Sequence, residues 1–197
     1  MSELKFIFTG TAGAGKTTAI AAISDVPPVS TDMEATDELR AIKQKTTVAM
    51  DFGELTLATG ETVFLYGTPG QERFRHMWEI LINGGLGLIV LIDMSRQAPV
   101  DDMRMYLSNF RKFIDETGAV IALTRSDIKA TPGIEAFQDA LTEMGLVLPI
   151  LYADPRQKDD VLMLLDMLIS IVELNQPDSD TGEDEYEYVD ALKSLSE

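Results

Sequence analysis

A glycine-rich segment near the start of the chain has residue types and spacing that suit the binding of phosphate. Residues 10–17 read GTAGAGKT and match the pattern G-x-x-x-x-G-K-[ST] at every fixed position. Glycine permits backbone conformations in which several N–H groups point at one anion. Lys16 is placed to reach the β- and γ-phosphates, and the Thr17 hydroxyl is a hard oxygen ligand of the kind that Mg²⁺ prefers. The segment predicts a site for a nucleoside triphosphate.

The elements on either side of this segment agree with that prediction. Residues 5–9 are a short apolar run typical of a buried strand, and residues 17–24 are rich in Ala and Ile and predict a helix. A helix that begins near Lys16 adds the positive end of its dipole to the phosphate site. The residues expected to contact the nucleotide here are Gly10, Ala12, Gly13, Ala14, Gly15, Lys16, Thr17 and Thr18.

Strands and helices alternate along the rest of residues 1–175, as in a layered α/β fold. The residues Ala58-Thr59-Gly60 predict a hairpin turn, and the continuous apolar run at 86–92 predicts a strand covered on both faces. Residues 27–45 have no clean period and indicate a long loop. The expected strands are 5–9, 47–57, 61–66, 86–92, 119–123 and 148–152; the expected helices are 17–24, 101–116, 133–144 and 160–174, with one more between the third and fourth strands.

Two further segments narrow the class of nucleotide-binding protein. Residues 46–53 read TTVAMDFG, and residues 66–75 read YGTPGQERFR. Together with the phosphate-binding loop, they resemble the Ras-like small GTPases, most closely the bacterial branch that includes MglA and the GTPases of Streptomyces conservons. The resemblance covers most of residues 4–174. It implies an α/β P-loop NTPase fold, a Ras-like and mostly parallel six-stranded sheet with one antiparallel strand and helices on both faces. It also implies a molecular switch that binds Mg²⁺ with GTP or GDP.

The resemblance carries specific roles onto this sequence. Thr47 corresponds to the switch I threonine that closes onto Mg²⁺ and the γ-phosphate, so Thr17 and Thr47 are the expected metal ligands. Gly70 would contact the γ-phosphate through its N–H, and Gln71 would orient the attacking water. Phosphoryl transfer needs a positioned nucleophile and stabilised charge, which such groups supply. The expected catalytic residues are Gln71, Lys16 and Thr47.

Three positions depart from the family pattern. Gly67 stands where small GTPases usually carry the aspartate that holds Mg²⁺ through water. Ala12 occupies a position that is often glycine, and its methyl group crowds the space for the catalytic water or an incoming arginine. Thr46 replaces an arginine that MglA carries just before its switch I threonine. Because a missing arginine finger lowers the rate by about 10³–10⁵, we expect slow intrinsic hydrolysis that a partner accelerates.

A third motif concerns the base. Small GTPases read guanine with N-K-x-D, and here Thr124, Arg125 and Asp127 stand at the three fixed positions. An aspartate accepts hydrogen bonds from two adjacent donors of guanine that adenine lacks, so Asp127 favours GTP; a turn cap after a strand is the alternative. The Arg125 side chain can lie over the base. Ala153 corresponds to the alanine whose N–H contacts guanine O6, whereas Asp154 departs from the family's lysine.

Composition limits the partners and the location of the protein. The 197 residues carry a formal net charge of −17 and include no cysteine. A strongly acidic chain argues against nucleic acid as a partner. With no cysteine to lipidate and no apolar run long enough to span a bilayer, we expect no integral or lipid membrane anchor and a cytoplasmic location. Residues 176–197 contain eight acids and one lysine and indicate an acidic flexible tail after a GTP-binding domain at 1–175.

The resemblance also suggests a protein partner. In the MglA branch the activator or effector is a roadblock/LC7-type homodimer, and the processes served are bacterial polarity, motility or signalling. Two other functions stay open: a nucleotide-binding scaffold that does not hydrolyse, supported by Ala12, Gly67 and the altered base motif, and a P-loop small-molecule kinase.

The single histidine, His76, is expected on a helix surface, and Trp78 is expected either to pack on the sheet or to be exposed to a partner.

Overall fold

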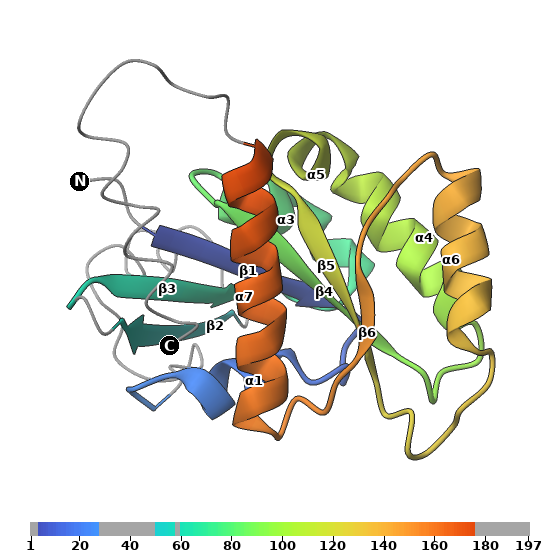
Figure 1. Ribbon diagram of the computed structural model, residues 1–197, viewed down its shortest axis with the longest axis horizontal. Helices are drawn as coiled ribbons and strands as arrows, with labels where there is room; N and C mark the ends of the chain where they lie inside the picture. The colour runs from blue at the N-terminus through green and yellow to red at the C-terminus, as the bar shows by residue number, and fades with distance from the viewer. Residues whose placement is uncertain (1–3, 28–49, 58–59, 176–197) are drawn as a thin grey trace.

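The computed structural model describes residues 4–27, 50–57 and 60–175, and its centre is a six-stranded sheet with the strand order β2-β3-β1-β4-β5-β6 (Figure 1). The β1, β3, β4, β5 and β6 strands run parallel, and β2 pairs antiparallel with β3. The strands are β1 (Leu4–Gly10), β2 (Asp51–Thr56), β3 (Thr62–Gly67), β4 (Gly87–Asp93), β5 (Ala119–Thr124) and β6 (Ile150–Tyr152). The mostly parallel sheet with one antiparallel strand confirms the predicted α/β P-loop NTPase fold.

Helices cover both faces of this sheet. One face carries α1 (Lys16–Ile23) and α7 (Lys158–Asn175), and α7 crosses in front of the strands in Figure 1. The opposite face carries α3 (Arg75–Leu81), α4 (Pro99–Asn109), α5 (Arg111–Thr117) and α6 (Ile134–Glu143). A short 3₁₀ turn, η1 (Glu72–Phe74), leads into α3. Among the described helices, none is long and apolar enough to cross a membrane.

The central strands are buried because each of their two faces supplies one of the two cores. Along β4, Ile89 and Leu91 belong to the core under α1 and α7, and Leu88 and Val90 belong to the core under α3 to α6. This is the period-2 alternation of a strand, with both sets of side chains apolar. The continuous hydrophobic run at 86–92 therefore predicted the strand and its burial correctly.

The helical region after β4 differs from its prediction. The sequence predicts one helix over 101–116, whereas the structure has α4 and α5, which meet at Phe110. Phe110 has φ −99° and ψ 9°, and its ring stacks on Trp78 at 5.3 Å between centroids. The interruption falls at a buried residue in a tertiary contact, and no Pro or Gly between 100 and 117 marks it in the sequence. Residues 47–49, part of the expected second strand, lie outside the described residues.

Candidate functional site

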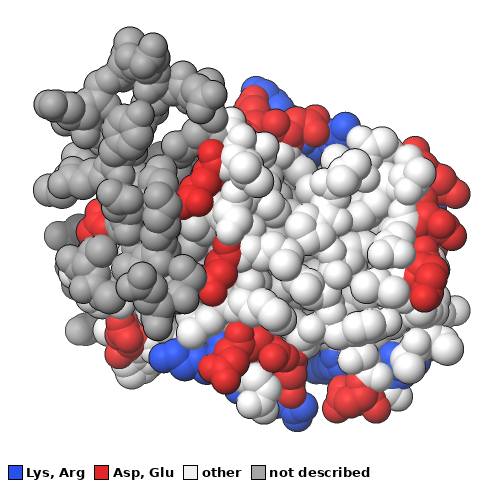
Figure 2. Space-filling model, in the orientation of Figure 1, with Lys and Arg blue, Asp and Glu red and all other residues white. Residues whose placement is uncertain are grey.

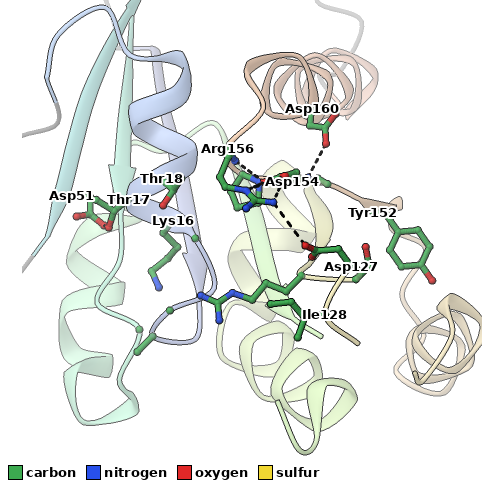
Figure 3. A pocket seen from close by; sticks show the side chains of 18 of the residues that line it. Lys16, Thr17, Thr18, Asp51, Asp127, Ile128, Tyr152, Asp154, Arg156 and Asp160 are labelled. Carbon is green, nitrogen blue, oxygen red and sulfur yellow. Dashed lines mark hydrogen bonds and ion pairs between the residues drawn. The ribbon is translucent and has the colours of Figure 1, made fainter. Parts of the chain in front are cut away.

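A pocket of about 920 Å³ opens where the parallel strands end, the edge at which α/β sheets bind ligands (Figure 3). Four loops and the start of β2 form its walls. The lining residues used below are Ala12, Gly13, Gly15, Lys16, Thr17, Thr18, Asp51, Gly70, Arg125, Asp127, Tyr152, Ala153, Asp154, Arg156 and Asp160. The phosphate-binding segment and the base-reading segment, more than 100 residues apart in sequence, therefore face one cavity.

The loop of residues 10–15 takes the backbone path that its glycines allow. Gly13 and Gly15 have φ of 83° and 102°, values that disfavour any residue with a side chain. Gly15 is also the N-cap of α1, so the positive end of that helix faces the pocket. A Cβ on Gly15 would lie 2.5 Å from Pro155 Cγ, so the loop touches the segment that follows β6. The result is a cradle of backbone N–H groups next to a helix start, which suits an anion.

Lys16 lies at the bottom of this cradle and is almost fully buried. Its Nζ donates to Gly10 O at 2.8 Å and to Thr11 O at 2.9 Å. Burial lowers the pKa of Lys16 to about 8, although the nearby carboxylate of Asp51 opposes this shift. Among the described residues, the hydrogen bonds of this ammonium group go to neutral carbonyls, and phosphate oxygens would provide stronger, charge-assisted acceptors.

Asp51 is the functional candidate that the sequence analysis missed. Its Oδ2 accepts a hydrogen bond from Thr17 Oγ1 at 2.6 Å, and its side chain lines the pocket (Figure 3). Asp51 is the register partner of Gly67 across the antiparallel pair β2–β3. A Cβ on Gly67 would lie 2.9 Å from Asp51 Cβ and 3.0 Å from Oδ2. The Asp51 carboxylate therefore occupies the space that a side chain at position 67 would fill.

A signal for Asp51 was present in the sequence. In the antiparallel pair of β2 and β3, residues whose numbers are equidistant from 59 lie directly opposite each other. That register places Asp51 on β2 directly opposite Gly67 on β3. The carboxylate that β3 lacks is therefore present on β2 at the paired position. Recognising it required the strand pairing as well as the motif.

Gly70 brings the 68–71 segment against the phosphate cradle. A Cβ on Gly70 would lie only 2.4 Å from Ala12 N and 2.7 Å from Thr11 C, so the two backbones are in direct contact. The preceding residue is anchored as well, because Thr68 N donates to Phe8 O at 2.8 Å. Gln71 follows immediately, but its side chain is exposed and does not line the pocket.

His76 is exposed, as expected, and Trp78 is buried, so it packs inside rather than facing a partner.

At the other end of the pocket, Thr124 connects β5 to the phosphate cradle. Its Oγ1 donates to Ala14 O at 3.0 Å and is also 3.3 Å from Ile92 O. Arg125, with φ of 58°, turns the chain and places NH1 3.4 Å from Oδ2 of the buried Asp93. Thr124 thus binds the phosphate-binding loop on the side away from the pocket. Arg125 lines the pocket, with its guanidinium near the buried Asp93 carboxylate.

Asp127 and the segment after β6 form the outer rim of the pocket. The side chain of Asp127 is 67% exposed and lies 3.9 Å from NH2 of Arg156. Arg156 also binds Asp154, with NH2 2.7 Å from Oδ2, and this hydrogen bond lowers the pKa of Asp154 (Figure 3). Ala153 N donates to Leu123 O at 3.1 Å. A contact from this N–H to guanine O6 therefore has to share or replace that bond.

The structure thus gathers most of the expected site residues, but not all of them. Those that line the pocket are Ala12, Gly13, Gly15, Lys16, Thr17, Thr18, Gly70, Arg125, Asp127 and Ala153. Gly10, Ala14 and Thr124 stand behind the lining and support it through the bonds given above. Gln71 lies next to the pocket with its side chain outside the lining, and Thr47 lies outside the described residues.

Comparisons with known proteins agree with this site. Residues 8–192 match the family described as conserved hypothetical ATP binding protein. The Ras-related protein RabC of Dictyostelium discoideum is 22% identical over 188 residues, 92% of this chain and 89% of that protein. The Ras-related protein RABA6a of Arabidopsis thaliana is 28% identical over 103 residues, and the GTP-binding protein YPTM2 of Zea mays is 28% identical over 109 residues.

These similarities differ in how much of each protein they cover. The RABA6a match covers 50% of this chain and 44% of that protein, and the YPTM2 match covers 51% and 52%. The chain therefore spans less than half the length of RABA6a, and only RabC among these three is similar along nearly its whole length. The family match covers the phosphate cradle, the 68–71 segment and the base-reading segment together. With its P-loop and its Ras-like α/β sheet, the chain belongs to the family of conserved hypothetical ATP binding proteins.

Proposed function

We propose that this protein is a cytoplasmic GTP-binding molecular switch that hydrolyses GTP slowly to GDP. The observation that carries the proposal is the contact between Gly70 and the Ala12 backbone beside the pocket. It places the segment expected to sense the γ-phosphate directly on the loop expected to hold the phosphates. A site that only holds a nucleotide does not need that second segment, whereas a switch does, because it must distinguish three phosphates from two.

Phosphate binding would rest on the cradle and Lys16. The backbone N–H groups between Gly13 and Thr17 and the start of α1 attract the triphosphate, and the buried Lys16 ammonium exchanges two carbonyl acceptors for phosphate oxygens. Because Thr124 and contact with Pro155 stabilise the cradle, we expect its shape to change little when a nucleotide binds. We expect both GTP and GDP to bind to this half of the site.

The residues next to the cradle fit a magnesium ion. Thr17 Oγ1 and the Asp51 carboxylate are hard oxygen donors 2.6 Å apart, on the pocket wall that continues from Lys16. Thr17, Asp51 and, by resemblance, Thr47 would hold the ion together with the phosphates. When bound, Mg²⁺ supplies positive charge against the charge that develops on the transferred phosphoryl group. Asp51 in this arrangement takes the place of the aspartate that Gly67 lacks.

Hydrolysis would then depend on Gly70 and Gln71. Water attacks the γ-phosphorus as the bond from that phosphorus to the β–γ bridging oxygen breaks, which yields GDP and phosphate. The Gly70 N–H is suited to donate to a γ-phosphate oxygen, and Gln71 would have to turn toward the pocket to orient the water. An exposed Gln71 supports low intrinsic activity that rises when a partner holds this side chain in place.

Guanine is the base that Asp127 favours. The carboxylate lines the open end of the pocket and is free to accept from the two adjacent donors of guanine once it separates from Arg156 at 3.9 Å. The match to a family described as ATP binding makes ATP the second candidate ligand. Guanine and adenine differ at the edge of the base that Asp127 would contact. The Asp127 side chain would therefore determine whether GTP or ATP binds more tightly.

A titration with GTP and ATP tests this proposal, with Asp127→Ala as the diagnostic variant. We expect wild type to prefer GTP at least tenfold in the presence of Mg²⁺, because two hydrogen bonds to a carboxylate separate the bases. Asp127→Ala should reduce that preference to about twofold. Asp139→Asn, which removes another exposed carboxylate on α6 outside the pocket, should change neither affinity. Equal affinity of wild type for GTP and ATP contradicts the guanine assignment.

The non-hydrolysing scaffold is the second candidate function, and the position of the Gln71 side chain is the observation that favours it. Resemblance to the MglA branch suggests that a roadblock/LC7-type homodimer acts as the activator or effector in bacterial polarity, motility or signalling. Single-turnover hydrolysis with and without such a protein separates the two candidates. Release of phosphate that increases with the partner supports the switch, and no release under either condition supports the scaffold.

A further inference from the structure

Two buried aromatic side chains hold the carbonyls of Pro69 and Gly70. Trp78 Nε1 donates to Pro69 O at 2.8 Å, and the Tyr106 hydroxyl donates to Gly70 O at 3.0 Å. Trp78 is 1% exposed and Tyr106 is fully buried, so water is not available to replace either donor. Two consecutive carbonyls of the segment next to the phosphate cradle are therefore held by helices α3 and α4.

Packing fixes both donors in place. The rings of Trp78 and Tyr106 lie 5.1 Å apart between centroids, and Trp78 also stacks on Phe110 at 5.3 Å. Burial raises the pKa of Tyr106, so its hydroxyl keeps its proton and remains a donor. Aromatic pairs of this kind resist rotation because each ring fills the space beside the next.

The direction of these carbonyls sets the direction of the N–H groups that matter for phosphate. In a trans peptide the C=O and N–H groups point in opposite directions. The Gly70 N–H therefore points away from Trp78, and the Gln71 N–H points away from Tyr106. Both aromatic side chains belong to the core under α3 to α6, so the two N–H groups point away from that core. Neither N–H has a hydrogen-bond acceptor within the part of the chain that the structure describes.

We propose that Trp78 and Tyr106 are positioning residues that fix the peptide groups on either side of Gly70 and so make the protein selective for the γ-phosphate. This proposal rests on the function proposed above and adds a structural reason why GTP and GDP would be distinguished. The Gly70 N–H is aimed by core packing before any ligand arrives, so little ordering is needed when GTP binds. GDP has no γ-phosphate to meet this N–H, so loss of the two hydrogen bonds affects GTP and leaves GDP binding unchanged.

Tyr106→Phe tests the proposal with the smallest possible change, because it removes one hydroxyl and retains the ring. Affinities for GDP and for a non-hydrolysable GTP analogue are measured with the full chain, together with the single-turnover rate. We expect the affinity ratio of the analogue to GDP to fall about three- to tenfold, the size of one hydrogen bond, with GDP affinity within twofold of wild type. The hydrolysis rate should fall by at least the same factor.

Phe137→Leu is the matched control. Phe137, on α6, is fully buried in the same core, and its ring pairs with neither Trp78 nor Tyr106. Its replacement should lower the melting temperature while the affinity ratio stays as in wild type. Trp78→Phe removes the second donor and provides an independent test should Tyr106→Phe fold poorly. It should lower the ratio in the same direction as Tyr106→Phe.

The outcomes separate this proposal from the proposed function. If wild type binds and hydrolyses GTP but Tyr106→Phe and Trp78→Phe keep its affinity ratio and rate, the positioning role is wrong and the switch stands. A Phe137→Leu protein whose ratio falls as far as that of Tyr106→Phe also overturns the role, because general loosening of the core then suffices. If wild type binds no guanine nucleotide, the proposed function itself fails.

Discussion

The Asp51 side chain fills the space that a side chain at position 67 would need, although the two residues belong to different strands. The carboxylate reaches Thr17 because residue 67 has no side chain, and a side chain at 67 would collide with Asp51. The sequence motif of β3 alone indicates that an aspartate is missing at position 67. The paired strands β2 and β3 nevertheless retain a carboxylate at this place, that of Asp51. The carboxylate expected at position 67 stands instead on the neighbouring strand.

This exchange predicts the behaviour of a swapped variant. Asp51→Asn should raise the Mg²⁺ concentration needed for half-maximal GTP binding about 10- to 100-fold, the usual cost of removing a carboxylate that supports a metal site. The double variant Asp51→Gly with Gly67→Asp should restore most of that loss, because the new side chain occupies the vacated space. Nucleotide affinity measured across a Mg²⁺ series tests both.

Glu54→Gln is the control for the swap, since Glu54 is another β2 carboxylate and lies outside the pocket lining. It should leave the Mg²⁺ dependence unchanged. Were the double variant as impaired as Asp51→Asn, the two positions would not be equivalent and the assignment of Asp51 to the metal would be wrong.

Lys16 predicts how GTP binding depends on pH. Its pKa is lowered to about 8 in the free protein by burial, and bound phosphates favour the charged form. Below pH 8 the lysine is already protonated, so affinity is flat; above pH 8 binding must take up a proton, and affinity falls up to about tenfold per pH unit. Calorimetric titration from pH 7 to pH 9.5 in buffers of different ionisation enthalpy measures both effects. Flat affinity with no proton uptake up to pH 9.5 would contradict the lowered pKa.

The same shift affects the stability of the free protein. Between pH 8 and the ordinary lysine pKa of 10.5, the unfolded chain carries a proton on Lys16 that the folded chain lacks. The unfolded state binds more protons there, so this group makes the free energy of unfolding rise with pH across that window. Below pH 8 its burial is a constant cost to folding.

At the scale of elements, the central relationship is the contact between the 68–71 segment and the phosphate cradle. Gly70→Ala places a methyl group 2.4 Å from Ala12 N, so the two segments must separate. We expect hydrolysis to fall at least about 100-fold, as when a backbone donor to a developing charge is lost, with GDP affinity within threefold of wild type. Single-turnover kinetics and GDP titration measure the two effects.

Gly133→Ala is a matched glycine change outside the site. A Cβ at this position meets only the Glu135 carboxylate, which can move aside. It should leave both the rate and the GDP affinity as in wild type. Should Gly70→Ala hydrolyse GTP at the wild-type rate, Gly70 would not be the γ-phosphate contact.

Sequence patterns predicted the elements best where local residues decide the outcome. The apolar runs predicted β4 and β5, and the glycine spacing predicted the cradle, because strand burial and positive φ depend on the residues themselves. The break at Phe110 has no Pro or Gly to signal it, and Trp78 is buried against rings from other helices, so no local pattern contains either feature. Asp51 falls between these cases, since its role requires only the register of one hairpin.

At the scale of the whole molecule, the net charge of −17 is unevenly placed. Figure 2 shows acidic side chains over α7 and along α6, with a broad uncharged surface between them. The pocket lining contains three cations, Lys16, Arg125 and Arg156, beside four carboxylates, Asp51, Asp127, Asp154 and Asp160. We therefore expect the attraction for a triphosphate to come from Lys16 and the backbone N–H groups of the cradle rather than from the lining as a whole.

Removal of residues 176–197 tests the expected domain boundary. Among the described residues, none that lines the pocket lies beyond Asp160, and eight of the acids are removed with the segment. We expect a chain of residues 1–175 to bind GTP within twofold of the full chain at physiological salt. A loss of tenfold or more, measured by titration at two ionic strengths, would show that the nucleotide-binding domain extends past residue 175.

The bond from Thr124 to Ala14 and the contact of Gly15 with Pro155 have a consequence for nucleotide exchange. They make the base-reading segments and the phosphate cradle one mechanical unit. Because these connected parts would hold the two ends of a bound GDP, we expect its spontaneous release to be slow. An exchange factor for this protein would have to loosen that joint or displace the phosphates from the cradle. If the protein is the switch proposed above, we expect its nucleotide exchange, like its hydrolysis, to be controlled by other proteins.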